Sequence, residues 1–221
     1  MQALSTQQLR QIEPLIEKYC IELSSNEDPL LKELYRETSH KILMPRMMTG
    51  HYMGVLLKMI SFLKKPDRIL EIGTFTGYST ICLSEGLTEN GEIHSIDINE
   101  EISDFTKKFI SKSKHKDKIH LHTGDAKKII PQLKYDFDLI FIDADKKNYC
   151  LYYEMCIKKL NRNGFILIDN VLWSGKLIDK IKKNDIETKE IKKLNKKIQD
   201  DPRVDNVLLP IRDGFMICKL K

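Results

Sequence analysis

The spacing of apolar residues divides the chain into a helical first part and a second part in which strands and helices alternate. In the first part, apolar side chains recur at helical spacing, which predicts three helices near 5–23, 29–40 and 50–63. From Arg68 onward, short apolar runs predict strands at 68–72, 92–97, 118–122, 138–143 and 164–168. Helices are predicted between these strands, near 77–88, 99–112, 125–132 and 148–160. Such alternation is typical of a mostly parallel sheet with helices on both faces.

The end of the chain follows a different pattern. A charged helix is predicted at 188–199, and Pro202 prevents its continuation. Two apolar runs at 206–211 and 214–220 surround an Asp-Gly pair, which is a strong signal for a hairpin. We therefore predict an α/β fold with a doubly wound sheet of about seven strands, mostly parallel and ending in an antiparallel hairpin. No linker marks a second domain, so we expect one domain over residues 1–221, with N-terminal helices at 1–63 and the sheet and hairpin at 68–221.

Composition agrees with a globular protein. Hydrophobic residues make up 41% of the chain and charged residues 31%. No apolar run approaches the ~18 residues of a membrane span, so no membrane partner is expected, and the polar start of the chain does not resemble a signal peptide. The five cysteines are scattered and include no Cys-x-x-Cys, which favours reduced thiols and predicts a cytoplasmic protein.

Positive charge is concentrated in two stretches, 107–118 and 180–197, within a net charge of +5. Lysine runs of this kind are most often solvated helix faces, but they also attract anionic substrates or nucleic acid. Apart from Phe109, no aromatic residue interrupts these lysines, which weakens the case for nucleic acid. We expect no nucleic-acid partner, and a nucleic-acid-binding protein remains the alternative from another class.

The first predicted strand runs into a glycine turn and then a helix, at residues 68–80. Glycines allow the backbone to approach a ligand, and the free N–H groups of the helix attract its anionic end. Either a tight turn without a ligand or a cofactor site fits this stretch. A dinucleotide site would need Gly-x-Gly-x-x-Gly, but only Gly73 and Gly77 are present, with the bulky Phe75 between them.

Ligands of open α/β sheets bind beyond the carboxyl ends of the strands. Asp97 ends the second predicted strand, at about the separation from the glycines at which an acid binds a ribose. It would alternatively cap the following segment. Asp143 follows the fourth strand, and Asp169 and Asn170 follow the fifth, so their oxygens should converge. An oxygen-only set suits Mg²⁺, Mn²⁺ or Ca²⁺ and suits zinc poorly.

Four stretches resemble the metal-dependent O-methyltransferases of the caffeoyl-CoA and catechol type. They read L-E-I-G-T-F-T-G-Y-S, D-L-I-F-I-D-A-D-K-K-N-Y, I-D-N-V-L-W-S-G and L-P-I-R-D-G. The resemblance covers nearly everything from Met44 to the end, while the first helices match only in kind. It implies the class I methyltransferase (Rossmann-like) fold and S-adenosylmethionine as the methyl donor. With the many apolar residues on the helices at 5–23 and 50–63, it also predicts a homodimer.

The resemblance implies roles for single residues. The metal ligands are Asp143, Asp169 and Asn170, and Lys146 matches the general base of the catechol enzyme. Trp173 falls where family members line the aromatic substrate pocket. Cofactor contacts fall on residues at strand ends and on the segments that follow: Glu71, Gly73, Ser79, Asp97, Ala126, Asp143, Asp145 and Tyr152. Asp125 is left open between a helix cap and a place beside the adenine.

The chain departs from the family pattern in two places. The stretch 46–49, Arg-Met-Met-Thr, precedes Gly50 where the family usually carries a polar, often acidic residue. Arg212 stands in the turn before Asp213 where the family usually has a small residue. Both places fall near the expected substrate mouth, so they concern the identity of the substrate more than the reaction.

The sequence therefore predicts transfer of a methyl group from S-adenosylmethionine to a hydroxyl of a vicinal dihydroxy aromatic molecule, assisted by a divalent metal. A nicotinamide-dependent oxidoreductase is the competing enzyme class. It would share the fold and the acid at Asp97. However, it would need the missing third glycine, and it would have no use for the pair Asp169-Asn170.

Overall fold

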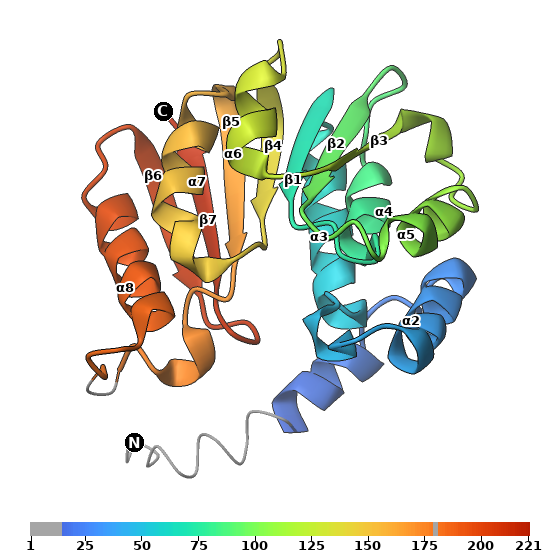
Figure 1. The fold of residues 1–221 in the computed structure, drawn as a ribbon, viewed down its shortest axis with the longest axis horizontal. Helices are drawn as coiled ribbons and strands as arrows, with labels where there is room; N and C mark the ends of the chain where they lie inside the picture. Colours follow the sequence, from blue (N-terminus) through green and yellow to red (C-terminus); the bar gives the residue numbers. More distant parts are fainter. Residues whose placement is uncertain (1–14, 179–180) are drawn as a thin grey trace.

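A seven-stranded sheet forms the centre of the computed structural model, which describes residues 15–178 and 181–221 (Figure 1). Its order is β3-β2-β1-β4-β5-β7-β6. The strands are β1 (Arg68–Ile72), β2 (Glu92–Asp97), β3 (Ile119–Thr123), β4 (Phe137–Ile142), β5 (Leu160–Asp169), β6 (Val204–Leu209) and β7 (Phe215–Leu220). The first five strands pair in parallel, and β7 is antiparallel to both β5 and β6. The predicted fold class and the hairpin are confirmed.

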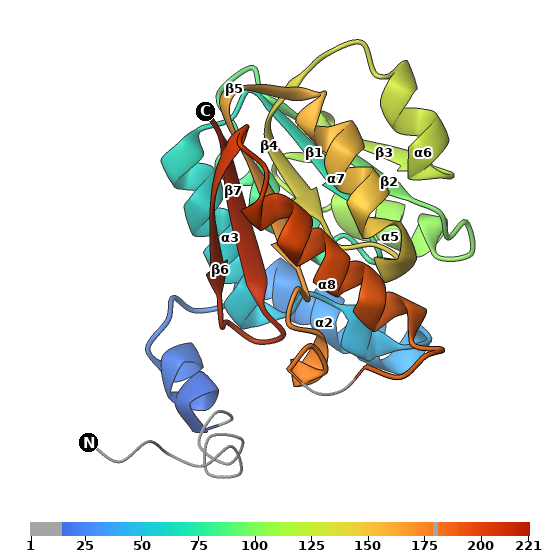
Figure 2. The ribbon, with the colours of Figure 1, turned by 90° about the vertical axis from the view of Figure 1, so that its left-hand side faces the viewer.

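Helices cover both faces of the sheet because side chains alternate along each central strand. In β4, Leu139 packs into one apolar layer and Ile140 into the other. The first layer holds α2 (Pro29–Lys41), α3 (His51–Lys64), α4 (Tyr78–Ser84) and α5 (Ser103–Ile110). The second holds α6 (Ala126–Ile129), α7 (Tyr149–Ile157) and α8 (Ile186–Gln199). Figure 2 shows α3 and α7 on opposite sides of the sheet.

Several boundaries differ from the prediction for local reasons. Helix α4 begins only after Gly77, whose φ of 90° is not helical. Helix α6 is a short turn that continues as a 3₁₀ turn at Ile130–Gln132, because Pro131 cannot donate a helical hydrogen bond. Strand β5 begins at Leu160 instead of residue 164, since Leu160 already pairs with Phe137 across a register shift. These differences change the lengths of elements and leave their order intact.

The predicted N-terminal helices are partly within the described residues. Residues 15–22 are helical, and the earlier part of the predicted first helix lies outside the described residues. Helices α2 and α3 follow as predicted, with α3 packed against α4 through Gly54, which lies beneath the ring of Tyr78. All five cysteines are free thiols, and four of them are buried. Within the described part of the chain, no helix is long and apolar enough to cross a membrane.

Candidate active site

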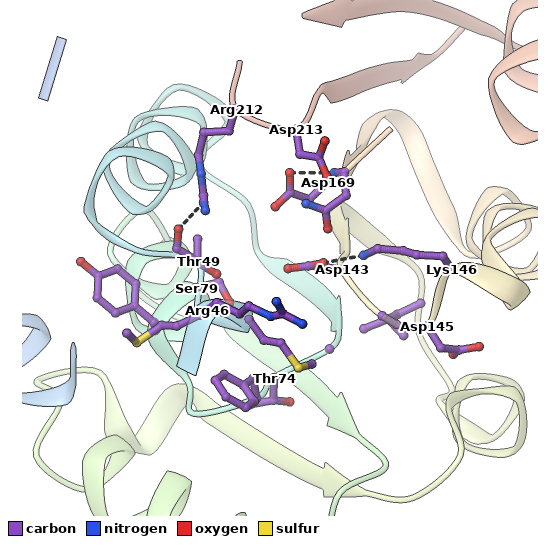
Figure 3. Close-up of a pocket in the computed structure, with 18 of the residues that line it drawn as sticks. Arg46, Thr49, Thr74, Ser79, Asp143, Asp145, Lys146, Asp169, Arg212 and Asp213 are labelled. Atoms are coloured by element: carbon purple, nitrogen blue, oxygen red, sulfur yellow. Dashed lines mark hydrogen bonds and ion pairs between the residues drawn. The ribbon is translucent and has the colours of Figure 1, made fainter. Parts of the chain in front are cut away.

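A cavity of about 1420 Å³ opens at the carboxyl ends of the parallel strands. Its walls come from the turns after β1 to β5, the Met-rich stretch before α3, and the turn between β6 and β7 (Figure 3). Pockets for one small molecule usually measure roughly 300–1,000 Å³. This cavity therefore has room for two reactants side by side.

The glycine turn forms the cavity wall after β1. At Gly73 the backbone has φ 105°, and a Cβ atom would lie only 1.9 Å from the carbonyl oxygen of Asp143. Only glycine fits there, because the ends of β1 and β4 come so close together. Gly77 also has positive φ, and Phe75 lies between the two glycines with φ 48°. Close packing of the two backbones is thus one reason for the glycines of this turn.

Asp97 holds this turn in place. Its Oδ2 atom accepts a hydrogen bond from the backbone N–H of Phe75 at 2.6 Å, and its Oδ1 atom accepts one from Asn99 at 2.8 Å. A carboxylate has about four acceptor positions, so both oxygens can still accept bonds from a ligand. Asp97 lines the cavity, and its role as ribose acceptor stays a prediction.

Glu71 lies beneath the turn, behind the residues that line the cavity. Its side chain is fully buried, and Oε2 accepts hydrogen bonds from Thr80 and Ser95. Its Oε1 atom has no hydrogen-bond partner. Burial raises the pKa of Glu71 to about 7, although the surrounding hydroxyls, Ser79 among them, oppose the shift. A buried and unpaired carboxylate oxygen is an acceptor for a cationic group.

The opposite wall of the cavity is formed by segments after β3 and β4. Asp125 caps α6 by accepting from the N–H of Lys127 at 2.9 Å, which is the first of its two predicted roles. Ala126 follows it at the cavity surface. Tyr152, from α7, donates a hydrogen bond to Asp145 at 2.6 Å, and burial together with this contact raises the pKa of Tyr152.

Two acids and an amide meet at the inner end of the cavity, as the strand topology predicted. Asp143 follows β4, Asp169 ends β5, and Asn170 comes next in a left-handed conformation with φ 60°. Asp169 is only 3% exposed. Burial raises the pKa of Asp169 to about 7, and the nearby carboxylate of Asp143 contributes to the rise. The two acids thus disfavour each other's charge, and a cation between them would remove that penalty.

Lys146 joins this group from the turn that precedes α7. Its ammonium donates to Oδ1 of Asp143 at 2.9 Å and to the hydroxyl of Tyr149 at 2.5 Å. The Tyr149 hydroxyl in turn donates to the backbone carbonyl of Asp169 at 3.2 Å. Lys146 is only 8% exposed, and its ammonium lies 5.9 Å from the ring centre of Trp173. The side chain is therefore held at the inner end of the cavity.

The residues at the two departures from the family pattern, the stretch 46–49 and Arg212, line the mouth of the cavity. Arg46 extends into it, and Arg212 donates to the backbone carbonyl of Thr49 (Figure 3). Trp173 lines the same region, and its indole N–H is buried without a hydrogen-bond partner. Cationic groups and an aromatic ring with an open donor thus surround the place where a substrate would enter.

Comparison with known proteins places this site in a family. The model of a family described as O-methyltransferase matches residues 21–221. The chain belongs to this family. It is 32% identical to a putative caffeoyl-CoA O-methyltransferase of Arabidopsis thaliana, with 92% of each chain covered. Caffeoyl-CoA O-methyltransferase 1 of Eucalyptus globulus is 34% identical over 77% of this chain and 72% of its own length.

Solved structures agree with the family. An O-methyltransferase from Bacillus cereus in complex with SAH superimposes with a TM-score of 0.87 and 29% identity, over 95% of this chain and 100% of its own. The SAH-bound methyltransferase of Podospora anserina gives a TM-score of 0.88 and 26% identity, over 100% and 99%. The protein is thus an S-adenosylmethionine-dependent O-methyltransferase, which decides between the two cofactors that the glycine turn left open.

Three residues of this O-methyltransferase site had no predicted role. Tyr149 bridges Lys146 and the end of β5. Its position three residues after Lys146 could have predicted the contact between these two side chains. Thr49 is buried at the mouth of the cavity. Asp213 accepts from the backbone N–H of Ser174 and thereby joins the hairpin turn to the loop after β5. The sequence marked Asp213 only as part of a hairpin turn and Thr49 only as part of the stretch 46–49. Their contacts in the site were not predictable, because distant segments make them.

Proposed function

We propose that this enzyme methylates one hydroxyl of a vicinal dihydroxy aromatic molecule, assisted by a divalent cation. The observation that supports this most is the group of Asp143, Asp169 and Asn170 beside Lys146. Two mutually repelling acids and an amide are a donor set that fits Mg²⁺, and Mn²⁺ or Ca²⁺ by the same chemistry. The same residues are distributed along the cavity that also contains the cofactor turn.

The substrate hydroxyl has to lose its proton before it can attack. A free phenol has a pKa of about 10 and is a weak nucleophile at neutral pH. When bound, the cation would hold two adjacent substrate oxygens and stabilise the ionised hydroxyl. We assign Lys146 as the general base, whose amine takes the hydroxyl proton. The oxygen then bonds to the methyl carbon as the carbon–sulfur bond breaks, and the sulfur keeps the electron pair.

The remaining residues orient the methyl donor for in-line attack. We assign its contacts to Glu71, Gly73, Ser79, Asp97, Ala126, Asp143, Asp145 and Tyr152. The buried, unpaired Oε1 of Glu71 supports this assignment, because the methionine part of the donor carries an ammonium group. The open acceptor positions of Asp97 suit the ribose hydroxyls. Ala126 and the pair formed by Tyr152 and Asp145 line the same cavity, and we assign them to the adenosine end of the donor.

The substrate is a small aromatic molecule in this proposal. The named relatives are caffeoyl-CoA O-methyltransferases. In this chain, Trp173 offers a ring face and an unpaired N–H at the mouth of the cavity. Arg46 adds positive charge there, which favours a substrate with an acidic group, while Arg212 shares its charge with Glu17 at 4.0 Å.

A catechol and its singly methylated form test the proposal directly. A vicinal diol offers two oxygens to one cation, whereas the methylated form offers one good donor, so we expect turnover of the diol only. Turnover should stop after chelation and return with Mg²⁺ or Mn²⁺. Mass detection of the product is the measurement, with S-adenosylmethionine saturating. Equal turnover of both compounds, or full activity after exhaustive chelation, would contradict the metal-assisted mechanism while leaving the family assignment intact.

We also propose that the enzyme forms a homodimer. On the helix at 15–22, Leu15 and Tyr19 are 68% and 64% exposed, and on α3, Phe62 and Leu63 are 41% and 86% exposed. Apolar side chains gathered on exposed helices are typical of a surface that a partner covers. Sedimentation at micromolar concentration should show twice the chain mass of 25.8 kDa. A single species at the chain mass would refute the dimer.

A further inference from the structure

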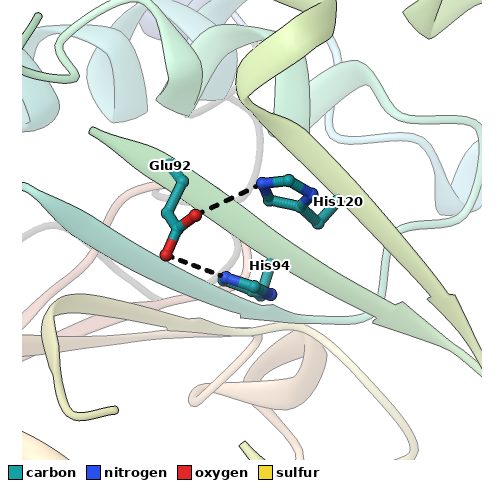
Figure 4. A group of neighbouring side chains, drawn as sticks. All are labelled: Glu92, His94 and His120. Atoms are coloured by element: carbon teal, nitrogen blue, oxygen red, sulfur yellow. Dashed lines mark ion pairs between the residues drawn. The ribbon is translucent and has the colours of Figure 1, made fainter. Parts of the chain in front are cut away.

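A second cluster of ligating side chains lies on the two strands at one end of the sheet (Figure 4). Glu92 and His94 come from the start of β2, and His120 comes from β3. His94 and His120 are direct partners across the two parallel strands. Because side chains of a strand alternate between faces, Glu92 and His94 point to the same side, and His120 and His122 do so on β3. Pairing thus gathers one acid and three imidazoles on one face.

The distances in this cluster match those around a small metal ion. The Nε2 atom of His94 lies 3.4 Å from Oε1 of Glu92, and the Nε2 atom of His120 lies 3.3 Å from Oε2 of Glu92. One ligand atom from each of the three residues lies within 4.8 Å of the other two. Ligands at the zinc–nitrogen distance of roughly 2.0–2.1 Å, in a tetrahedron, stand about 3.3 Å apart. Small side-chain rotations would bring the three atoms to one centre.

His94 provides an independent observation. Its ring is buried, and its Nε2 atom, although 3.4 Å from Glu92 Oε1, makes no contact with hydrogen-bond geometry. The other ring nitrogen, Nδ1, lies 2.9 Å from Nε2 of His122. A histidine that ligates a metal is usually held at its second nitrogen by a carboxylate, a carbonyl or a water, and here the imidazole of His122 takes that place.

We propose that Glu92, His94 and His120 form a binding site for a divalent transition-metal ion, with Zn²⁺ as the expected occupant. Two imidazoles and one carboxylate are a common zinc donor set, and they suit Mg²⁺ poorly. His120 is exposed, so an ion can enter from solvent and keep a water as its fourth ligand. Arg68 Nε also lies 3.4 Å from Glu92 Oε1, and its guanidinium stacks over the ring of Tyr135 at 4.9 Å, so an entering ion would replace the contact between Arg68 and Glu92.

This site is separate from the active site. Asp97, at the cofactor end of β2, is five residues beyond Glu92, which corresponds to roughly 17 Å along a strand. The ion would instead link β3, the edge strand of the sheet, to its neighbour β2. Its role is therefore structural. The proposal is independent of the substrate and of the metal that the active site uses.

Titration of tag-free protein with Zn²⁺ tests the site. Excess Mg²⁺ is present throughout, so that it occupies the proposed oxygen-ligand site in the active site. We expect one Zn²⁺ per chain, bound at least about tenfold more weakly after His120→Ala, because a ligand is lost. His40→Ala is the matched control. His40 is also an exposed histidine, on α2, and its ring bonds only to the carbonyl of Arg36, so zinc affinity should not change. Unfolding of both variants is followed to confirm that they are folded.

Cobalt gives a second readout, because tetrahedral Co²⁺ absorbs visible light far more strongly than octahedral Co²⁺. Native protein and His40→Ala should give the strong absorption, and His120→Ala and Glu92→Gln should lose it. Zinc should also raise the unfolding temperature of native protein more than that of Glu92→Gln. Equal zinc affinity of native protein and His120→Ala, or weak cobalt absorption in the native protein, would overturn the proposal.

Discussion

Asp169→Asn should remove metal-dependent turnover and at the same time stabilise the metal-free protein at pH 8. Asparagine keeps the shape of the side chain but removes its charge. We expect turnover to fall at least about a hundredfold, because losing a ligand costs at least as much as losing the groups that orient it. Stability should rise because the ionised Asp169 is buried beside the carboxylate of Asp143. Loss of activity together with gain of stability is the signature of a charge that is kept for function.

The pH dependence of this gain follows from the direction of the pKa shift. Burial raises the pKa of Asp169 from 3.8 to about 7. Below the ordinary value, the carboxyl is protonated in both the folded and the unfolded chain, so its charge changes nothing. As the pH rises toward 7, the unfolded chain ionises first, and the free energy of unfolding falls. Above pH 7 the loss is complete and amounts to about 4 kcal/mol, so Asp169→Asn should gain up to that amount.

Chemical unfolding at pH 4 and pH 8, with and without Mg²⁺, measures this effect. Native protein should be stabilised by Mg²⁺ at pH 8, and Asp169→Asn should not. Asp136→Asn is the matched control, because Asp136 is exposed and the change should stay within about 0.5 kcal/mol at either pH. If Asp169→Asn is no more stable than native protein at pH 8 and retains full turnover, Asp169 is neither a strained acid nor a metal ligand.

Lys146→Ala should lower the methyl-transfer rate by roughly 10²–10⁴, the usual contribution of a general base. The side chain is buried beside Asp143 and Tyr149, so its amine lies next to the proposed metal ligands. Burial raises the pKa of Tyr149 well above its ordinary value. Tyr149 therefore keeps its proton and is a poor candidate for the base. Turnover at saturating catechol, measured by product mass, gives the rate.

Substrate acidity separates proton removal from a purely electrostatic role. A nitrocatechol is already largely ionised at neutral pH, so it does not need a base, and Lys146→Ala should slow its methylation much less than that of catechol. Lys146→Arg keeps the positive charge but cannot accept a proton, so it should behave like Lys146→Ala with catechol. Tyr149→Phe is the matched control, which removes a contact of Lys146 and should cost far less. Equal losses of rate with both substrates would disprove the general-base role.

Much of the fold could be predicted because it depends on local patterns. Alternating apolar runs identified all seven strands, and the Asp-Gly turn identified the hairpin at Asp213. The ends of helices were less accurate. Helix α6 is limited by Pro131, and β5 begins early because Leu160 has a partner on β4. The length of an element depends on its neighbours in space, which the local pattern does not contain.

The residue types needed for the chemistry were also visible in the sequence. Strand ends pointed to Asp97, Asp143 and Asp169, because parallel strands bring their carboxyl ends to one edge of the sheet. What each residue contacts was decided by the tertiary structure. Asp97 fastens the glycine turn through Phe75, and Glu71 lies behind the cavity wall with one oxygen unpaired. Such contacts join segments that are far apart in the chain.

The sequence by itself determined the succession of strands and helices along the chain, the glycine turn and the acids that follow the strands. Only the tertiary structure decided how strongly these groups interact. The raised pKa of Asp169 comes from burial and from Asp143, which follows a neighbouring strand. The cluster at His94 likewise exists only because β2 and β3 pair in one register. Burial and electrostatic coupling depend on distance and on exclusion of water, and both are set when the chain packs.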